Sequence, residues 1–205
     1  RGLGDVYKRQ IGNRVADPVY TGIQINVQGT INVAEASRLT GVKRLIHIST
    51  FGVYDRTDEG TEPLSVDAPQ WGINPYSATK VANELLMRSY QNHYRSFNLA
   101  VVRPANVYGP GHFWGGSGGG AMVQSLVAAG IAGTTARIPS ASTRAFEYVY
   151  YKDLGRLIDR AATVDLPDYC AFNAGNGIIT QFSELVEAVR SALPGLQVEI
   201  LEGAT

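Results

Sequence analysis

Short apolar runs alternate along the chain with longer segments in which apolar residues recur every three or four positions. The short runs have the character of buried parallel strands, and they cover residues 45–48, 99–102, 148–151, 170–174 and 198–201. The longer segments have the spacing of amphipathic helices, and they cover residues 18–40, 75–86, 122–129, 153–162 and 182–193. This alternation predicts an α/β fold built on a parallel sheet.

Residues with strong local preferences mark the ends of the first two helices. Asp17 is predicted to cap the first helix, Pro18 to occupy its first helical position, and Gly41 to end it. Residues 109–120 are rich in glycine and proline and are interpreted as a loop. Pro75 opens the second helix, whose apolar side is predicted to consist of Ala78, Val81, Ala82, Leu85 and Leu86.

The regular alternation of strands and helices does not extend over the whole chain. It breaks in residues 110–150 and 175–205, and we predict that these segments form a smaller lobe that holds substrate. Residues 1–10 show neither helical nor strand spacing, and residues 5–10 look like the translation of a sequencing adaptor. We therefore interpret residues 1–10 as a non-native scar and residues 11–205 as one partial domain.

Composition narrows the class of protein. The chain has 205 residues, of which 44% are hydrophobic, so it can bury a sizeable core and is not intrinsically disordered. Lys and Arg together number 18, as do Asp and Glu, and this balance argues against a nucleic-acid partner. No apolar run approaches the roughly 20 residues that span a bilayer, so no membrane segment is expected.

The single cysteine, Cys170, cannot form an internal disulfide. We therefore expect a reducing, cytoplasmic setting. The three histidines and Cys170 lack the spacing of metal ligands, so we predict no metal site.

The strongest chemical signal is the pair Tyr76 and Lys80, four positions apart at the start of the second helix. Residues at this spacing face the same side of a helix. An isolated tyrosine has a pKa of about 10, which is too high for a base at neutral pH. A neighbouring ammonium favours the phenolate and lowers that pKa, so Tyr76 can act as a general acid or base. Taken alone, the pair is better explained by a surface lysine beside a half-buried tyrosine, and the residues around it reverse that preference.

Polar residues follow two of the predicted strands. Ser49 and Thr50 come directly after residues 45–48, and Asn106 follows residues 99–102 by a short turn. Ligands of open α/β sheets bind beyond the carboxyl ends of the strands, where a hydroxyl can hydrogen-bond a substrate oxygen. The alternative is that small polar residues merely end the strand.

Taken in order, these motifs resemble the extended short-chain dehydrogenase/reductase family, and most closely its NAD-dependent epimerase/dehydratase branch. The resemblance covers nearly all of residues 11–205, and its motifs lie in residues 26–30, 48–54, 76–80 and 103–110. It implies a Rossmann-like, doubly wound parallel sheet, truncated at the N-terminus, with a small C-terminal substrate-binding lobe.

The resemblance also implies a role for individual residues in the reaction. Tyr76 is the catalytic acid/base, Lys80 holds the nicotinamide ribose, and Thr50 shares the proton-transfer hydrogen bond and contacts substrate. On the cofactor side the resemblance places Asn26, Ser49, Tyr76, Lys80 and Pro104. On the substrate side it places Thr50 and Asn106, and we add Arg144 as a phosphate contact.

The implied function is hydride transfer by an NAD(P)-dependent epimerase or dehydratase acting on a sugar or nucleotide-sugar, with NAD favoured over NADP. Two alternatives stay open. One is a simple dehydrogenase or reductase of a sugar, steroid or other alcohol. The other is a non-catalytic dinucleotide sensor, against which the presence of both Tyr76 and Lys80 argues. The resemblance further suggests a homodimer.

Two features depart from the family's pattern. The dinucleotide fingerprint G-x-x-G-x-x-G is absent, and we expect it upstream of Ile11. The glycine-rich residues 115–121 are not that site, because no buried strand precedes them, and they are interpreted as a mobile substrate-side loop. Phe146 stands where many nucleotide-sugar members carry an arginine. Either Arg144 takes over the phosphate, or the substrate lacks a pyrophosphate.

We predict that residues 11–205 alone neither fold robustly nor bind a dinucleotide tightly. Without the first strands, one edge of the sheet stays unpaired and apolar surface stays exposed. Thermal unfolding and cofactor titration of this segment test the prediction. A cooperative melt together with micromolar cofactor affinity contradicts it.

Overall fold

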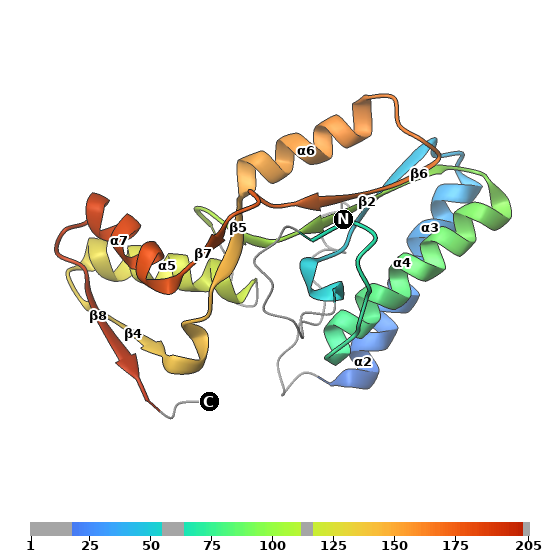
Figure 1. Cartoon of the computed structure of the whole chain (residues 1–205). Coiled ribbons are helices and arrows are strands. Elements are labelled where there is room, and N and C mark those ends of the chain that lie inside the picture. The colour runs from blue at the N-terminus through green and yellow to red at the C-terminus, as the bar shows by residue number, and fades with distance from the viewer. Residues whose placement is uncertain (1–17, 55–63, 112–116, 203–205) are drawn as a thin grey trace. The chain divides into compact units, whose positions relative to one another are not determined.

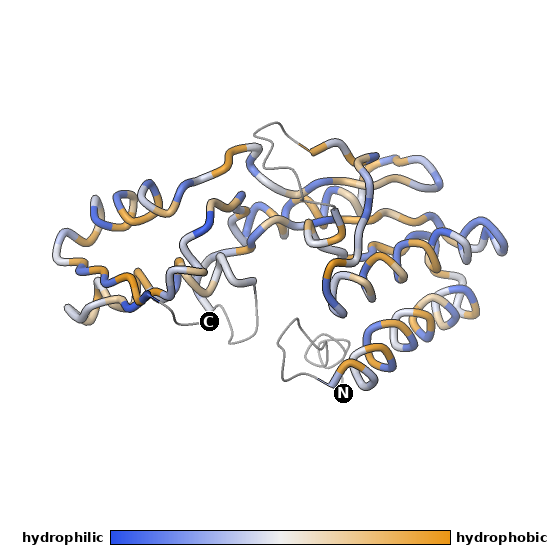
Figure 2. The backbone as a smooth tube through the Cα atoms, turned by 60° about the horizontal axis from the view of Figure 1, so that its bottom comes forward, coloured by the Kyte–Doolittle hydropathy of each residue, from blue (hydrophilic) through white to orange (hydrophobic). Residues whose placement is uncertain are grey.

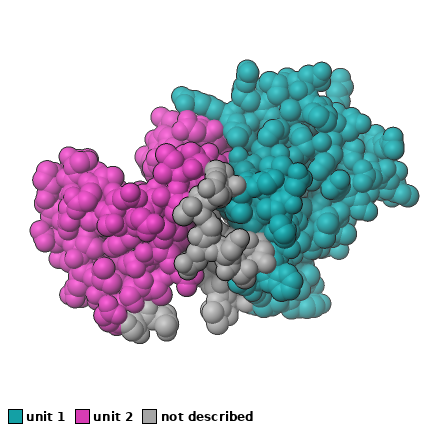
Figure 3. Space-filling view, viewed as in Figure 1, with its two compact units in different colours: residues 1–104, 156–173 teal, residues 105–155, 174–205 magenta. Residues whose placement is uncertain are grey.

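The computed structural model describes residues 18–54, 64–111 and 117–202. Predictions for residues 1–17, including the scar and the Asp17 cap, lie outside the described residues. The chain divides into two compact units (Figure 3). Unit 1 comprises residues 1–104 and 156–173, and unit 2 comprises residues 105–155 and 174–205. That unit 2 holds substrate stays a prediction.

The sheet of unit 1 has the strand order β1-β2-β6, formed by β1 (Arg44–Ile48), β2 (Asn98–Pro104) and β6 (Tyr169–Ala174). β1 and β2 are parallel, with Arg44 opposite Asn98. The run Leu99 to Val102 on β2 is fully buried, as expected for a central strand between covered faces. The parallel α/β arrangement predicted from the apolar runs is thereby confirmed.

Two helical segments accompany this sheet and lie side by side (Figure 1). The first runs through α2 (Val19–Ile23), the π-helical turn η1 (Gln24–Gln28) and α3 (Gly29–Leu39). Gly41, with φ of +69°, follows the end of this segment, as predicted. Ala34 of α3 packs in one buried cluster with side chains from the second helix, from β2 and from the turn between them: Met87, Phe97, Leu99 and Val101.

The second helix, α4 (Pro75–Tyr94), begins with a reciprocal cap. The Asn74 side chain accepts a hydrogen bond from the Ser77 amide at 2.9 Å, and the Ser77 hydroxyl accepts one from the Asn74 amide at 3.1 Å. Pro75 occupies the first helical position, where no amide hydrogen is needed. The predicted start of this helix is therefore confirmed.

The prediction of which side of α4 is buried is wrong. Leu85 is 62% exposed and Leu86 is 40% exposed, although apolar residues recur regularly along the helix (Figure 2). The inward face instead consists mainly of polar residues, namely Ser77, Thr79, Lys80, Asn83, Glu84, Met87 and Gln91. The reason is that this face meets polar groups of η1 and β2, with which it exchanges hydrogen bonds.

Unit 2 has its own apolar core, built between helices α5 (Gly118–Ala132) and α7 (Phe182–Ala192) and their strands. One sheet has the order β3-β5-β7, with β5 (Phe146–Tyr150) parallel to β3 (Asn106–Tyr108) and antiparallel to β7 (Ile179–Thr180). The second pairs β4 (Thr135–Pro139) with β8 (Gln197–Leu201) in parallel. The pattern of apolar residues did not predict β3, β4 and β7.

Two further elements complete the described chain. Helix α6 (Tyr151–Thr163) follows β5, with its first five residues in unit 2 and the rest in unit 1. Short 3-10 turns are η2 (Phe51–Val53) and η3 (Ser140–Ser142). In the parts of the chain that the structure describes, no helix has the length and apolar character needed to cross a membrane.

The glycine-rich segment differs from the predicted loop. Residues 118–120 form the first turn of α5, and the Ser117 hydroxyl caps it by accepting from the Gly120 amide at 3.1 Å. The Gly119 amide donates to Asn106 Oδ1 at 3.2 Å. A Cβ at Gly119 would lie 2.7 Å from Asn106 Cγ, so this turn needs a glycine where it passes the Asn106 side chain.

We predict that Gly119→Ala lowers the free energy of unfolding by about 1–3 kcal/mol. The added methyl would clash with the Asn106 side chain, including its Cβ, which cannot move away without shifting the backbone. Gly118→Ala is the matched control in the same helical turn, since a Cβ added there would meet no described neighbour within 4 Å. We expect it to leave stability unchanged or slightly raised. Denaturant unfolding of both variants, made in the whole protein, tests this prediction. Equal effects of the two substitutions contradict the packing argument.

Candidate functional site

The first turns of α4 place Tyr76 and Lys80 on one side of the helix. The Lys80 ammonium lies 5.7 Å from the centre of the Tyr76 ring. Lys80 is only 2% exposed, and its ammonium donates to the Ile48 carbonyl at 3.1 Å. The two side chains therefore meet at the carboxyl end of β1, where the predicted hydroxyls follow.

Ser49 and Thr50 continue the chain directly beyond β1. The Ser49 amide donates to the Val102 carbonyl at 2.7 Å, which extends the pairing with β2 by one residue. The Ser49 side chain is buried, and its hydroxyl lies beside the Glu84 carboxylate, whose pKa it helps to lower. Thr50 is half-buried, and its hydroxyl accepts from the Gly52 amide at 3.1 Å as the cap of η2.

Asn26 lies buried in the π-helical turn. Its side-chain amide donates to the Thr79 hydroxyl at 3.1 Å, next to Lys80 in α4. Its backbone carbonyl accepts from the Thr30 hydroxyl at 2.7 Å and from the Asn83 amide at 3.0 Å. Such π-turns often occur at functional sites, and this one fixes the first helical segment to the part of α4 that carries Lys80.

Burial dominates the electrostatics of this site. It lowers the pKa of Lys80 to about 8, although the Glu84 charge acts in the opposite direction. His47, on β1, is buried as well. Burial and then the Lys80 charge lower the pKa of His47 to about 4, so this imidazole is neutral at neutral pH. Lys80 consequently stands as a desolvated cation beside a neutral imidazole.

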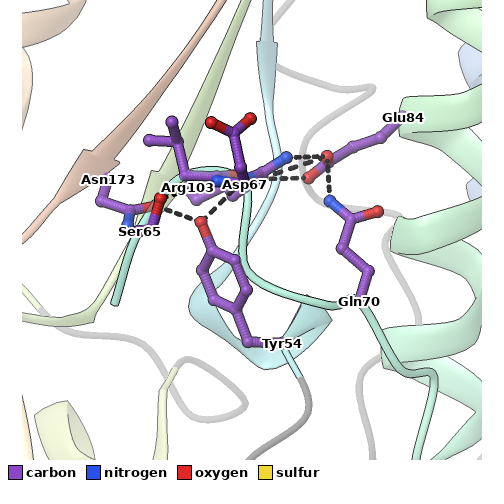
Figure 4. A network of polar contacts seen from close by, with 8 residues as sticks. Tyr54, Ser65, Asp67, Gln70, Glu84, Arg103 and Asn173 are labelled. Atoms are coloured by element: carbon purple, nitrogen blue, oxygen red, sulfur yellow. Dashed lines mark hydrogen bonds and ion pairs between the residues drawn. The ribbon is translucent and has the colours of Figure 1, made fainter. Parts of the chain in front are cut away.

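Sequence reasoning missed a buried ion pair between β2 and α4 (Figure 4). The side chains of Arg103, on β2, and Glu84, on α4, are 4% and 3% exposed. Arg103 donates from Nη2 to Glu84 Oε2 at 2.7 Å and from Nε to Oε1 at 3.0 Å. Burial raises the pKa of the Glu84 carboxyl, but the Arg103 guanidinium holds that pKa below its usual value.

The ion pair is the centre of a larger polar network. Arg103 also donates to the Tyr54 hydroxyl at 2.6 Å and to the Val66 carbonyl at 2.7 Å. The Tyr54 hydroxyl donates to Asn173 at 2.5 Å, and the Asn173 amide donates to the Leu64 carbonyl at 2.7 Å. The network thus fixes residues 64–66 against the sheet. Tyr54 and Arg103 stand in the motifs that carry the family resemblance, which is the one signal in the sequence for this network.

The remaining predicted residues are divided between the units. Pro104 is buried at the end of β2 in unit 1, whereas Asn106 and Arg144 belong to unit 2. The Asn106 side chain donates to the Glu147 carbonyl at 3.3 Å and accepts from the Gly119 amide. Arg144 is exposed. Contact of either residue with substrate stays a prediction.

Within unit 1 the site therefore assembles a phenol, a desolvated ammonium and strand-end hydroxyls at one edge of a parallel sheet. This set of groups can move a proton to and from a substrate hydroxyl. Among the described residues, no group of three or more His, Cys, Asp or Glu side chains is placed to hold a metal ion.

Known proteins are similar to this chain in sequence and in fold. A UDP-glucose 4-epimerase from Mycolicibacterium smegmatis is 34% identical over 179 residues, which cover 87% of this chain and 55% of that protein. A trifunctional UDP-glucose 4,6-dehydratase, epimerase and reductase from Arabidopsis thaliana is 44% identical over 92 residues, covering 43% of this chain and 13% of that protein.

The crystal structure of UDP-glucose 4-epimerase from Thermus thermophilus in complex with NAD is similar, with a TM-score of 0.77 and 25% identity. The match covers 89% of this chain and 58% of that one. The chain thus spans about half the length of the relatives that it matches over most of its residues. Residues 8–175 match the NAD-dependent epimerase/dehydratase family, and the chain belongs to that family.

Proposed function

We propose that the whole protein is an NAD-dependent epimerase of a nucleotide-sugar, with Tyr76 as the acid/base of a reversible hydride transfer. The observation that carries this proposal is the placement of the Lys80 ammonium 5.7 Å from the Tyr76 ring centre and 3.1 Å from the Ile48 carbonyl. Epimerisation rather than dehydration is proposed because the relative that matches 87% of this chain is a UDP-glucose 4-epimerase.

The proton chemistry follows from the charges at the site. The Lys80 cation favours the phenolate form of Tyr76, which can then accept a proton from a sugar hydroxyl. The Thr50 hydroxyl, two residues after Ile48 in the chain, provides a second hydrogen bond to the oxygen of that sugar hydroxyl. NAD, when bound, supplies the reversible hydride acceptor that such a reaction needs.

The residues present fit the ribose of a dinucleotide. An ammonium has three donors, and Lys80 has one acceptor among the described residues, the Ile48 carbonyl. Ribose hydroxyls are suitable acceptors for the other two. The buried Ser49 hydroxyl, which lies beside Glu84 at the same sheet edge, offers a further polar contact. We assign NAD rather than NADP because the similar Thermus thermophilus enzyme was crystallised with NAD.

We also propose a homodimer in the cytoplasm. Large apolar side chains are exposed on the adjacent helices α2 and α4, including Tyr20 and Leu85. Covering them with a second copy removes apolar surface from water. The free thiol of Cys170 fits a reducing compartment.

We predict that Tyr76→Phe in the whole protein lowers kcat for UDP-glucose epimerisation by about 10²–10⁴-fold, because the phenolic proton acceptor is lost. NAD binding, measured by fluorescence titration, survives the change. Tyr94→Phe is the control on the same helix, since Tyr94 is exposed in its last turn. Unchanged turnover in Tyr76→Phe contradicts the assignment of this residue.

A second prediction concerns the cost of keeping Lys80 charged. Its pKa in the folded protein is about 8, below the ordinary 10.5, so the charged form opposes folding at neutral pH. Lys80→Met, measured without cofactor, should raise the free energy of unfolding at neutral pH by about 2 kcal/mol, after allowing for the lost hydrogen bond. Turnover should fall at the same time.

The sign of the pH dependence tests this prediction. Between about pH 8 and 10.5 the unfolded chain binds the Lys80 proton and the folded chain releases it, so wild-type stability rises relative to the variant. The advantage of Lys80→Met should therefore shrink over this range in denaturant titrations. A variant that is less stable than wild type at neutral pH shows instead that Lys80 stabilises the fold.

A further inference from the structure

Lys80 has two neighbours on its own helix that compete for its charge. Tyr76, Lys80 and Glu84 follow one another at intervals of four residues, so all three lie along one face of α4. Lys80 and Glu84 are both buried. In such a setting an attraction between opposite charges is stronger than at the surface. An ammonium held by Glu84 is no longer available to Tyr76.

Lys80 and Glu84 nevertheless form no ion pair in the described part of the chain. Both Glu84 oxygens are occupied by other donors. Oε1 accepts from Arg103 Nε at 3.0 Å, and Oε2 accepts from Arg103 Nη2 at 2.7 Å and from Gln70 Nε2 at 2.7 Å. The Lys80 ammonium donates to the Ile48 carbonyl instead.

Arg103 is itself firmly placed. It lies next to the last residue of β2, and its Nη1 donates to the Tyr54 hydroxyl at 2.6 Å and to the Val66 carbonyl at 2.7 Å. Its guanidinium also lies over the Tyr54 ring, 5.1 Å from the centre. These contacts hold the cation at the Glu84 carboxylate, because moving it toward any other partner would break several hydrogen bonds at once.

We propose that Arg103 is a positioning residue for the reaction, which binds the Glu84 carboxylate and so keeps the Lys80 ammonium available to Tyr76 and the ribose. This inference rests on the proposed function of the Tyr76 and Lys80 pair. In this proposal the buried ion pair contributes to the reaction in addition to holding β2 against α4.

The groups around Lys80 agree with this assignment. On α4 they are Tyr76 and Glu84, and β1 contributes His47, which is neutral because its pKa is lowered to about 4. The turn η1 contributes the uncharged Asn26. Glu84 is thus the anion whose charge raises the pKa of Lys80, and Arg103 is the cation that offsets it.

A purely structural role explains the pair less well. Taking two charges out of water is costly, and apolar residues of similar volume often replace a buried ion pair without loss of stability. Removing only one partner has a different result, since it leaves an uncompensated charge. The two roles can therefore be separated by comparing a single substitution with a double one.

The experiment measures the pH profile of kcat/KM for UDP-glucose in the whole protein, which reports groups of the free enzyme. Arg103→Met leaves Glu84 free to bind Lys80, so the acid limb, on which Tyr76 loses its proton, should move up by about one pH unit. At neutral pH this corresponds to about a tenfold loss. The double variant Arg103→Met, Glu84→Leu removes the competing anion, and its acid limb should return to the wild-type position.

An acid limb that stays in place in Arg103→Met overturns the proposal, as does a double variant whose limb stays displaced. Should Arg103→Met fail to fold, Glu84→Gln provides the test, because it removes the anion and keeps the shape. Its acid limb should not move up, and an upward shift contradicts the proposed competition.

A readout without turnover separates this inference from the proposed function. The ultraviolet absorbance of the Tyr76 phenolate, taken as the difference from the matching Tyr76→Phe protein, should shift to higher pH in Arg103→Met and return in the double variant. If wild type does not turn over UDP-glucose, the proposed substrate fails while this titration still decides the role of Arg103.

Discussion

The desolvated ammonium of Lys80 is the constraint around which the polar contacts between α4 and the sheet of unit 1 are arranged. This buried cation has lost most of its hydration, and burial accordingly lowers its pKa to about 8. Its hydrogen bond to the Ile48 carbonyl joins α4 to the carboxyl end of β1. A charge in such a place opposes folding unless surrounding contacts hold it, so the polar groups around it determine how helix and sheet meet.

The inward face of α4 shows how those contacts are arranged. Thr79 accepts from Asn26, Asn83 donates to the Asn26 carbonyl, and Glu84 binds Arg103. Each of these bonds replaces a hydrogen bond to water, so its net contribution to stability is modest, and its main effect is to fix the orientation of the two groups. Apolar stabilisation comes from neighbouring positions, where Met87 and the fully buried residues of β2 pack together. Residues of α4 that make polar contacts near the site therefore alternate with residues that pack in the apolar core.

Unit 2 likewise combines an apolar core with a polar side chain that is fixed by hydrogen bonds. Its core between α5 and α7 is apolar, while Asn106 is held from both ends of its amide by the Gly119 amide and the Glu147 carbonyl. The glycine at position 119 allows the backbone to approach that side chain. A side chain whose rotamer is set by such contacts keeps its orientation before any ligand arrives.

The sequence by itself determined the α/β class, the start of α4, and the common side of Tyr76 and Lys80, because apolar runs, a proline at the first helical position and a four-residue spacing act locally. Only the tertiary structure decided which face of α4 is buried, since Leu85 and Leu86 have helical spacing yet stay exposed. The strands β3, β4 and β7 exist through pairing with distant partners. The contact between Arg103 and Glu84 likewise joins two elements. It forms only when the helix packs on the sheet, so no local sequence pattern predicts it.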